Sequence, residues 1–293
     1  MGKYSIKDLE QLSGIKAHTI RIWEKRHNLI SPSRTETNIR FYSDEDLKRI
    51  INISLLNNYG IKISRIASMT DKEVHEKVLE ISEIKNEATI HIDQLVVAMI
   101  DIDEAHFEKI LNTLILRYGF EKTITEMIYP FLEKIGVLWQ TKNITPAHEH
   151  FISNLVRQKI IVAIDGLALP PTSAHRVLLF LPENELHEIG LLFYHYLVRK
   201  AGYRTYYLGQ NVPHDDLMKI VEIHRPQTLI TSITSLPSKP IDQYFQRLTN
   251  DFPDLLILAS GLQIQRYKGL KVNNIQTFST VLELKNILPT LAK

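Results

Sequence analysis

The sequence has 293 residues, 44% hydrophobic and 23% charged, which is enough for more than one domain at roughly 100 to 200 residues each. It contains no cysteine, which excludes disulfide scaffolds, zinc ribbons and thiol nucleophiles. The first residues lack the apolar core of a signal peptide, and no segment approaches the roughly 18 uninterrupted apolar residues of a membrane helix. We therefore expect a cytoplasmic protein without a membrane partner.

The net charge of +2 is divided unevenly along the chain. Residues 1–70 hold 12 lysines and arginines against 7 aspartates and glutamates, whereas residues 71–293 hold 23 against 26. A basic region favours a polyanionic partner, because phosphates that are neutralised by lysine and arginine release their counterions. The asymmetry therefore favours nucleic acid as the partner of the N-terminal region.

The N-terminal region has the pattern of short helices separated by turns. Apolar residues recur at three- and four-residue intervals in residues 5–14 and 16–26. Ser5 is a candidate N-cap of the first helix, and Gly14 is a candidate stop. Two short helices joined by a glycine turn predict a helix-turn-helix, whose second helix enters the major groove of DNA. The polar side chains on that second helix are Lys16, His18, Thr19, Arg21 and Lys25.

Residues 4–50 resemble the winged helix-turn-helix of the MerR family of transcription regulators. The matching motifs are R-x-W-E-x-R at Arg21 to Arg26, N-x-R-x-Y at Asn38 to Tyr42 and S-x-x-D-L at Ser43 to Leu47. The resemblance implies that Tyr4, His18, Thr19 and Arg21 lie at double-stranded DNA, and that Arg34, Arg40 and Tyr42 belong to the wing and grip the DNA backbone. From the helix pattern, we expect Lys16 to contact DNA as well. Tyr42 and Trp23 can also be interpreted as core aromatics, and we favour that interpretation for Trp23. We expect this domain to cover residues 1–72.

The middle of the chain is helical in pattern, with glycine and proline confined to the breaks. Pro146 lies in the first turn of the last helical stretch, where its missing N–H costs nothing. We expect a helical linker and a four-helix bundle over residues 73–170. The amphipathic stretches cover residues 71–100, 103–119, 120–140 and 145–169.

From residue 171 the pattern changes to short apolar or β-branched runs separated by helical stretches. Alternating strands and helices predict a parallel sheet covered on both faces, with ligands bound at the carboxyl ends of the strands. We therefore expect a Rossmann-like, flavodoxin-like α/β domain over residues 171–293. No G-x-G-x-x-G or G-x-x-x-x-G-K-[ST] motif follows a strand, which argues against a dinucleotide or P-loop site. The candidate strands are residues 176–184, 203–210, 228–235, 255–261 and 274–280.

The first of these strands leads into Glu185-x-His187-x-x-Gly190, which resembles the D-x-H-x-x-G motif of cobalamin-binding domains. In that family the motif histidine replaces the corrinoid's own base as the lower axial ligand, so the resemblance makes His187 the ligand of the cobalt. A carboxylate two residues earlier can hydrogen-bond the other ring nitrogen and fix its tautomer. A glycine at position 190 lets the corrin approach the backbone.

Later loops of the α/β domain extend this resemblance. The family receives the displaced base in a slot lined by the ends of the third and fourth strands, where this sequence has Ser232 and Thr234, then Ser260 and Gly261. Leu208 to Pro213 matches the L-G-x-x-x-P turn after the second strand. A lone serine or glycine at a strand end is often only a turn residue, but an ordered set of matches favours a cobalamin site.

The helical segment resembles the other half of such a site. Trp139, followed after nine residues by Glu149 and His150, resembles the W-x9-E-H signature of cobalamin-dependent photoreceptor repressors, in which a four-helix bundle encloses the upper face of adenosylcobalamin. An indole offers a large apolar contact, and Glu and His offer hydrogen bonds. A zinc site at His148 to His150 is the alternative, but adjacent residues point to different helix faces and no H-E-x-x-H motif is present.

Three positions depart from the family pattern. Gln140 replaces the histidine that captures cobalt after photolysis, Glu185 replaces aspartate, and Ser260 replaces the first glycine of a pair. The first departure puts the capture step in doubt, and the other two alter the corrinoid loops.

We expect a multidomain transcription regulator, a repressor and not an enzyme. Its assembly into a dimer or tetramer and its binding to a DNA operator would depend on cobalamin, either adenosylcobalamin with a response to light or methylcobalamin. Two alternatives stay open. One is a MerR-type regulator whose body binds no cobalamin, and the other is a corrinoid methyl carrier, although no substrate-activating module is visible.

Overall fold

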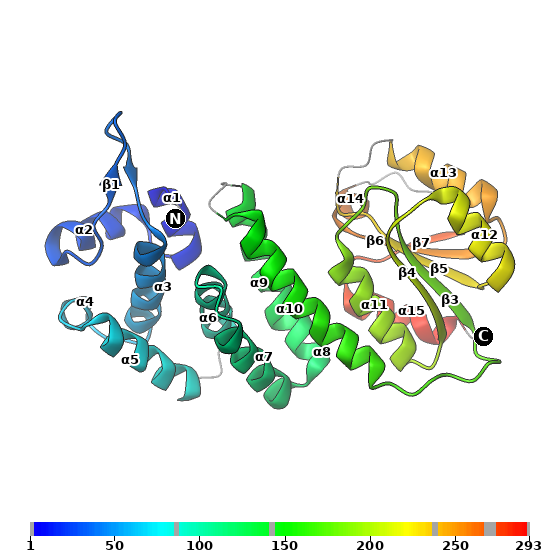
Figure 1. Ribbon diagram of the computed structural model, residues 1–293, viewed down its shortest axis with the longest axis horizontal. Helices are drawn as coiled ribbons and strands as arrows, with labels where there is room; N and C mark the ends of the chain where they lie inside the picture. Colours follow the sequence, from blue (N-terminus) through cyan, green and yellow to red (C-terminus); the bar gives the residue numbers. More distant parts are fainter. Residues whose placement is uncertain (1–2, 85–87, 141–143, 236–239, 267–273, 292–293) are drawn as a thin grey trace. The chain divides into compact units, whose positions relative to one another are not determined.

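The computed structural model describes residues 3–84, 88–140, 144–235, 240–266 and 274–291 (Figure 1). The chain forms two compact units, residues 1–155 and 156–293, and the division falls inside one long helix, α10. Within the described ranges, no helix combines the length and the apolar character needed to cross a membrane.

Unit 1 begins with the predicted helix-turn-helix. Ser5 caps α1 in a capping box with Asp8, and Gly14 ends that helix with a left-handed φ of 72°, so both predicted boundaries are confirmed. Ser43 caps α3 in the same way with Asp46. The elements are α1 (Ile6–Ser13), α2 (Ala17–His27), β1 (Ser33–Arg34), β2 (Arg40–Phe41), α3 (Asp44–Asn58) and α4 (Ile63–Ile66).

The two short strands form an antiparallel wing. Ser33 pairs with Phe41 and Arg34 with Arg40. The wing is joined to the start of the chain by a backbone bridge between Tyr4 and Tyr42. Trp23 is buried in the core beside these elements, as the sequence predicts.

The rest of unit 1 is helical. The predicted stretch over residues 71–100 contains two helices, while residues 120–140 form one helical run that passes through a π turn at Ile124–Ile128. This π turn precedes Pro130, which has no N–H to donate to a carbonyl one turn earlier. The elements are α5 (Asp71–Ile84), α6 (Ala88–Ile100), α7 (Glu104–Tyr118), α8 (Phe120–Thr123), η1 (Ile124–Ile128), α9 (Tyr129–Gln140) and α10 (Pro146–Asp165).

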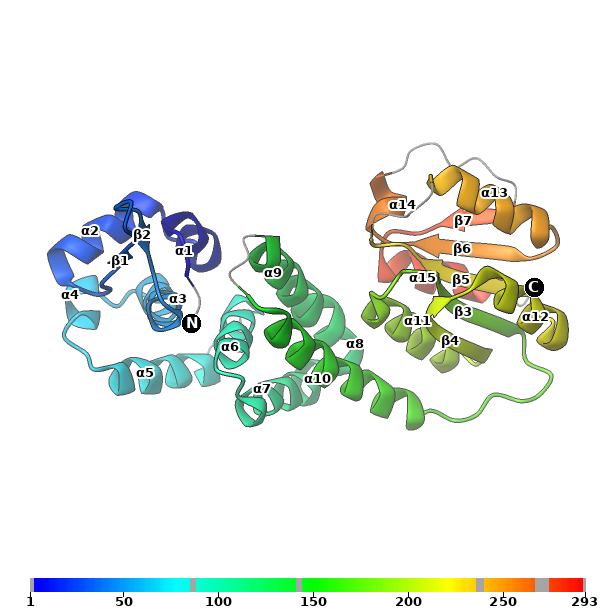
Figure 2. The same cartoon turned by 45° about the horizontal axis from the view of Figure 1, so that its top comes forward.

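A layer of aromatic and aliphatic side chains holds α6, α7 and α9 together. Phe107 of α7 and Phe131 of α9 pack with ring centroids 5.9 Å apart, and both are fully buried. Lys134 of α9 pairs with Asp93 of α6 at 2.6 Å. These contacts, with the first half of α10, form the predicted helical bundle (Figure 2).

Unit 2 contains the predicted parallel sheet, and all five predicted strands form. The strand order is β4-β3-β5-β6-β7, with every pair parallel. The elements are β3 (Arg176–Pro182), α11 (Glu188–Lys200), β4 (Arg204–Val212), α12 (His214–His224), β5 (Thr228–Ser232), α13 (Ile241–Asp251), β6 (Leu256–Ser260), α14 (Leu262–Arg266), β7 (Ile275–Thr277), α15 (Val281–Ile287) and η2 (Leu288–Thr290).

Both faces of the sheet are covered by helices. Leu178 and Phe180 of β3 belong to a core cluster with Leu217 of α12 and Phe245 of α13. Alternate residues of a strand point to opposite faces, so the remaining apolar residues of β3 face α11 and α15 (Figure 1). The chain goes from β3 outward to β4 and then returns to β5, which makes the carboxyl ends of β3 and β5 a topological switch point.

Candidate functional site

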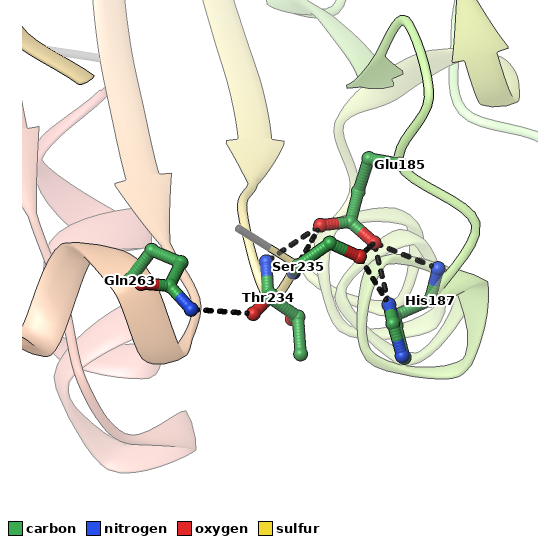
Figure 3. Close-up of polar contacts among 5 residues, drawn as sticks. All are labelled: Glu185, His187, Thr234, Ser235 and Gln263. Atoms are coloured by element: carbon green, nitrogen blue, oxygen red, sulfur yellow. Dashed lines mark hydrogen bonds and ion pairs between the residues drawn. The ribbon is translucent and has the colours of Figure 1, made fainter. Parts of the chain in front are cut away.

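The loops after β3 and β5 meet at this switch point around one buried carboxylate, Glu185, which is 2% exposed. Its Oε2 accepts hydrogen bonds from the backbone N–H groups of Thr234 and Ser235, both at 2.7 Å. Its Oε1 accepts from the backbone N–H of His187 at 3.0 Å and from the Ser235 hydroxyl at 3.1 Å. Glu185 therefore joins two loops that are about 50 residues apart in the sequence (Figure 3).

His187 is held by this carboxylate. Its Nδ1 lies 2.6 Å from Glu185 Oε1 and 3.1 Å from the Ser235 hydroxyl oxygen. The imidazole is nevertheless 61% exposed, and it stands at the N-cap of α11 (Figure 3). With Nδ1 facing the carboxylate, Nε2 is the ring nitrogen on the far side from Glu185, where it can act as a donor to a metal.

The hydrogen bonds decide the charge of Glu185. Burial raises the pKa of a carboxyl group, but the bonds from His187, Ser235 and Thr234 outweigh burial here and lower the pKa of Glu185 to about 2. The group is therefore an anion at neutral pH. An anion beside Nδ1 stabilises a proton on that nitrogen and orients the ring.

The loop after β3 is braced by an irregular end of β4. The pairing of β3 with β4 shifts register twice beyond Leu179, so β4 carries extra residues there. Asn211, at a positive φ of 57°, accepts from the Asn184 N–H at 2.9 Å and donates its own N–H to the Glu185 carbonyl at 3.2 Å. The predicted turn from Leu208 to Pro213 thus lies mostly inside the strand and acts as a bulge.

Two glycines at the carboxyl edge have different roles. A Cβ at Gly190 would meet no atom within 4 Å, which fits a corrin face approaching the backbone there. Gly261 has a φ of +107°, and a Cβ there would overlap the backbone of Ile233, 2.6 Å from its carbonyl carbon. Gly261 is therefore required for close packing of the β5 and β6 ends.

The residues predicted to line the base slot lie at the carboxyl ends of β5 and β6. Ser232 and Ser260 are buried, and the Ser260 hydroxyl lies 3.2 Å from the hydroxyl of Tyr194 on α11. Thr234 contributes its N–H to Glu185, and its carbonyl accepts from the side chain of Gln263 at 3.0 Å (Figure 3). The side chain of Ser260 therefore fills space that a glycine at this position would leave open.

The predicted residues of the helical segment lie in unit 1. Glu149 on α10 accepts from Ser153 at 2.6 Å and pairs with His150 Nδ1 at 2.8 Å, while His150 is 72% exposed. Trp139 is on α9, but its side chain lies outside the described residues, as does that of Gln140. Among the described side chains, which include His148 to His150, no group of three or more residues that could hold a metal ion is present.

In the helix-turn-helix, α2 presents one continuous exposed face. His18, Arg21, Ile22 and Lys25 are exposed at helical spacing, while Thr19 is half-buried. Lys16, just before the helix, is exposed and pairs with Glu10 at 3.2 Å. Its basic and hydrogen-bonding side chains are of the kinds that contact the major groove in helix-turn-helix proteins.

The wing is also exposed. Arg34 contacts the Asn38 side chain at 2.5 Å, and Arg40 lies 3.6 Å from Glu24. Both arginines are accessible at the strand pair, although Arg40 is only partly exposed. Their position fits contacts with a phosphate backbone.

Tyr4 and Tyr42 do not fit the predicted DNA contact. They are 2% and 0% exposed, and their hydroxyls donate to Asp44 at 2.8 Å and to Glu24 at 3.3 Å. Both rings fill the core because the bridge between them closes the base of the wing. The prediction that these two side chains touch DNA is corrected accordingly.

Several residues of the site were missed by sequence reasoning. Ser235 is the last residue of a predicted strand, yet its contact with both Glu185 and His187 depends on a fold that brings two distant loops together. Gln263, which braces Thr234, likewise has no motif of its own. Ile22 on α2 had a visible signal, since it lies four residues after His18 on the predicted DNA-facing helix.

Parts of the chain match two known protein families, and most of the chain is similar to two transcriptional repressors. Residues 4–73 match the model of the MerR HTH family regulatory proteins, and residues 91–163 match that of the B12 binding domain. The HTH-type transcriptional repressor CarH of Myxococcus xanthus is 26% identical over 257 residues, which is 85% of each chain. The repressor CarA of the same organism is 25% identical and covers 78% of this chain and 75% of its own.

Two further similarities concern parts of the chain. The HTH-type transcriptional regulator GlnR of Bacillus anthracis is 32% identical over 114 residues, which is 39% of this chain and 83% of that regulator. The Methanosarcina barkeri monomethylamine corrinoid protein superposes with a TM-score of 0.52 and 13% identity, covering 70% of this chain and 100% of its own. At this identity the second likeness concerns the fold alone.

Proposed function

Because the chain belongs to the MerR family of helix-turn-helix regulators and carries a B12 binding domain, we propose that it is a cobalamin-controlled transcriptional repressor. The observation that carries the cofactor half of this proposal is the Glu185–His187–Ser235 cluster, in which Nδ1 faces a buried anion while the ring stays exposed. Its similarity to the repressors CarH and CarA supports the regulatory half.

The residues of the α/β unit fit a corrinoid at the carboxyl edge of the sheet. His187 would donate Nε2 to cobalt, Glu185 would keep the ring in one tautomer, and Gly190 leaves the approach open. Adenosylcobalamin, when bound, supplies a cobalt–carbon bond that light can break. Trp139, Glu149 and His150 are the residues that we propose for its upper side.

Cobalamin binding would change DNA affinity by changing the oligomeric state of the protein. One helix-turn-helix covers a single half-site, and two or more linked copies bind a symmetric operator far more tightly without any new base contact. We therefore propose a dimer or tetramer as the DNA-binding form, with cobalamin setting the oligomeric state. The DNA contacts would come from Lys16, His18, Thr19 and Arg21 of the helix-turn-helix, with Arg34 and Arg40 from the wing.

A second candidate function is regulation without cobalamin, and one observation favours it. Ser260 replaces a glycine of the family's base slot, and its hydroxyl lies 3.2 Å from that of Tyr194, so its side chain occupies space that a glycine would leave open. In that case the body serves assembly alone, and DNA affinity does not change when cobalamin is added, in the dark or in light.

The test compares His187→Ala with His224→Ala. His224 is a matched control, since its ring packs on Tyr206 at the C-terminal end of α12 and away from the loop of Glu185. We expect the first variant to lose most of its affinity for cobalamin and the control to retain it. In the wild type, the electron paramagnetic resonance signal of bound cobalt(II) cobalamin should show hyperfine coupling that changes with ¹⁵N-histidine labelling. If His187→Ala binds cobalamin as tightly as the wild type, His187 is not the cobalt ligand.

A further inference from the structure

His187 is the central residue of a tight turn between the loop after β3 and the helix α11. Its φ and ψ are −78° and 71°, and the Glu188 N–H donates to the Leu186 carbonyl at 2.9 Å. These values are those of an inverse γ-turn. Glu185 holds the imidazole of His187, but the backbone of the turn is closed by Glu188. The direction in which the imidazole points therefore depends on how firmly Glu188 is held.

The side chain of Glu188 is anchored to two other elements of unit 2. Its Oε2 lies 3.0 Å from the Nε of Arg157 on α10, and its Oε1 accepts a hydrogen bond from the Tyr207 hydroxyl of β4 at 2.8 Å. The position of Gly209 leaves room for this carboxylate, since a Cβ there would lie 3.2 Å from Oε1. Both oxygens of Glu188 are thus engaged by groups outside the turn.

Burial distinguishes this anchor from an ordinary charge at a helix end. An acidic residue in the first turn of a helix interacts favourably with the helix dipole, and an exposed side chain is enough for that. The side chain of Glu188 is only 11% exposed, so it needs partners that replace water. Burial, and then the bond to Glu188, raises the pKa of Tyr207, so the Tyr207 hydroxyl keeps its proton and donates. Hydrogen bonds to an ionised carboxylate are stronger than those between neutral groups.

From this geometry we propose that Glu188 is a positioning residue for His187. By fixing the closing residue of the turn, it holds the imidazole in the orientation that presents Nε2 to a metal. The inference rests on the proposed function, because it gives Glu188 a part in holding cobalamin through His187 and no contact with cobalamin itself. Partners that orient a metal-binding histidine typically contribute about 10–100-fold to metal affinity.

The test uses the full-length wild type, Glu188→Gln and Arg157→Met. It measures their affinity for cobalamin and, at saturation, the electron paramagnetic resonance of bound cobalt(II) cobalamin with ¹⁵N-histidine labelling. We expect Glu188→Gln to bind about tenfold more weakly and to show histidine coupling in a smaller share of the bound cobalt. Arg157→Met should change both in the same direction but by less, because the Tyr207 bond remains. The Arg157 side chain is 48% exposed, so we expect this second variant to fold.

Thermal unfolding without cobalamin separates positioning from a purely structural role. A structural role alone would lower the melting temperature of Glu188→Gln but leave the axial ligand of its bound cobalt unchanged. The matched control is Glu283→Gln, since Glu283 also lies in the first turn of a helix of unit 2 and accepts a backbone hydrogen bond. This control should bind cobalamin and show histidine coupling as the wild type does.

The outcomes distinguish this inference from the proposed function. Wild-type affinity and wild-type histidine coupling in Glu188→Gln would overturn the role of Glu188 while leaving His187 as the ligand. A change in Glu283→Gln as large as that in Glu188→Gln would also overturn it, because any first-turn carboxylate would then have the same effect. An absence of histidine coupling in the wild type would remove His187 as the ligand, and the role of Glu188 with it.

Discussion

At the scale of single residues, Glu185 determines the geometry of the candidate site. One carboxylate accepts hydrogen bonds from His187, Thr234 and Ser235 and thereby fixes the loops after β3 and β5. The longer side chain of glutamate, compared with the aspartate of the family motif, still reaches the Nδ1 of His187 at 2.6 Å. The departure from aspartate therefore does not remove the contact on which the cobalt ligand depends.

The ionised state of Glu185 makes a pH-dependent contribution to stability. Its pKa is about 2 in the folded protein against an ordinary value of 4.5. A depressed carboxyl pKa stabilises the fold above pH 4.5, and the contribution is lost as the pH falls towards 2. We expect Glu185→Gln to lower the free energy of unfolding by about 3 kcal/mol at pH 7. Urea denaturation at a series of pH values measures this difference, which should shrink steadily below pH 4.5.

A matched control for this prediction is Glu283→Gln. That carboxylate also accepts a backbone hydrogen bond, from Ser279 at 2.7 Å, but it lies elsewhere in the α/β unit and at the surface. We expect Glu283→Gln to lower the free energy of unfolding by much less than Glu185→Gln does. A difference between wild type and Glu185→Gln that stays constant from pH 7 to 3 would contradict the account.

The sequence predicted part of this site for clear physical reasons. Glu185 and His187 lie in one short motif directly after a strand, so local order was enough to pair them. Ser235 was missed because its contact depends on the switch of strand order, which no local pattern contains. The family resemblance places Tyr4 and Tyr42 at DNA, whereas both rings are buried and their backbones form a bridge, a contact between distant residues that no local pattern contains.

At the scale of elements, α2 is expected to read DNA through one exposed face. Arg21 lies at the centre of this face and is exposed. Arg21→Ala should weaken binding to duplex DNA by about 1–3 kcal/mol, or reduce the slope of log K against log salt by about 1 if the contact is with a phosphate. Fluorescence anisotropy at several salt concentrations separates these outcomes.

The control for α2 is Lys109→Ala, which removes one exposed positive charge from α7 and not from the helix-turn-helix. It should leave both the affinity and the salt dependence unchanged. Equal losses for the two variants would mean that net charge, and not the face of α2, governs binding.

The helix α11 also contains a pH-sensitive element. His195 is buried, its Nε2 lies 2.8 Å from the Thr205 hydroxyl, and its ring stacks on Tyr207 with centroids 4.9 Å apart. Burial, and then Arg199, lowers the pKa of His195 to about 4. Between pH 6.5 and 4, His195 is protonated in the unfolded chain but stays neutral in the folded protein. The stability of the fold therefore falls as the pH drops from 6.5 towards 4.

We expect His195 to account for about 3 kcal/mol of this acid destabilisation. His195→Phe keeps an aromatic ring beside Tyr207 and cannot be protonated, so its stability should decline less than that of the wild type between pH 6.5 and 4. Thermal unfolding across this range measures the difference. Parallel curves for the two proteins would contradict the assignment.

The sequence predicts helices and strands best where the apolar residues follow a single periodicity. All five strands of the sheet appear because their apolar runs are short and lie between helical stretches. The amphipathic stretch predicted over residues 71–100 contains both α5 and α6, because amphipathic periodicity alone does not mark where one helix ends and the next begins. The turn from Leu208 to Pro213 lies mostly within β4 because Gly209 and Asn211 adopt positive φ values, which permit a bulge without ending the strand.

At the scale of the whole molecule, one helix belongs to both units. The division between the units falls at residues 155 and 156, while α10 is continuous from Pro146 to Asp165. Arg157 of this helix pairs with Glu188 at 3.0 Å, and Glu188, the residue after His187, also accepts from the Tyr207 hydroxyl at 2.8 Å. Glu188 therefore connects the loop of His187 to the second half of α10 within unit 2.

We propose that cobalamin held at His187 controls the assembly of DNA-binding copies of this chain. The most direct measurement follows adenosylcobalamin through gel filtration with the protein in the dark and after illumination, recording corrinoid absorbance, mass and retention of operator DNA together. We expect corrinoid to elute with a dark oligomer that retains DNA, and light to lower both the mass and the DNA retention. Elution without corrinoid, or identical mass and DNA retention with and without cobalamin, would contradict it.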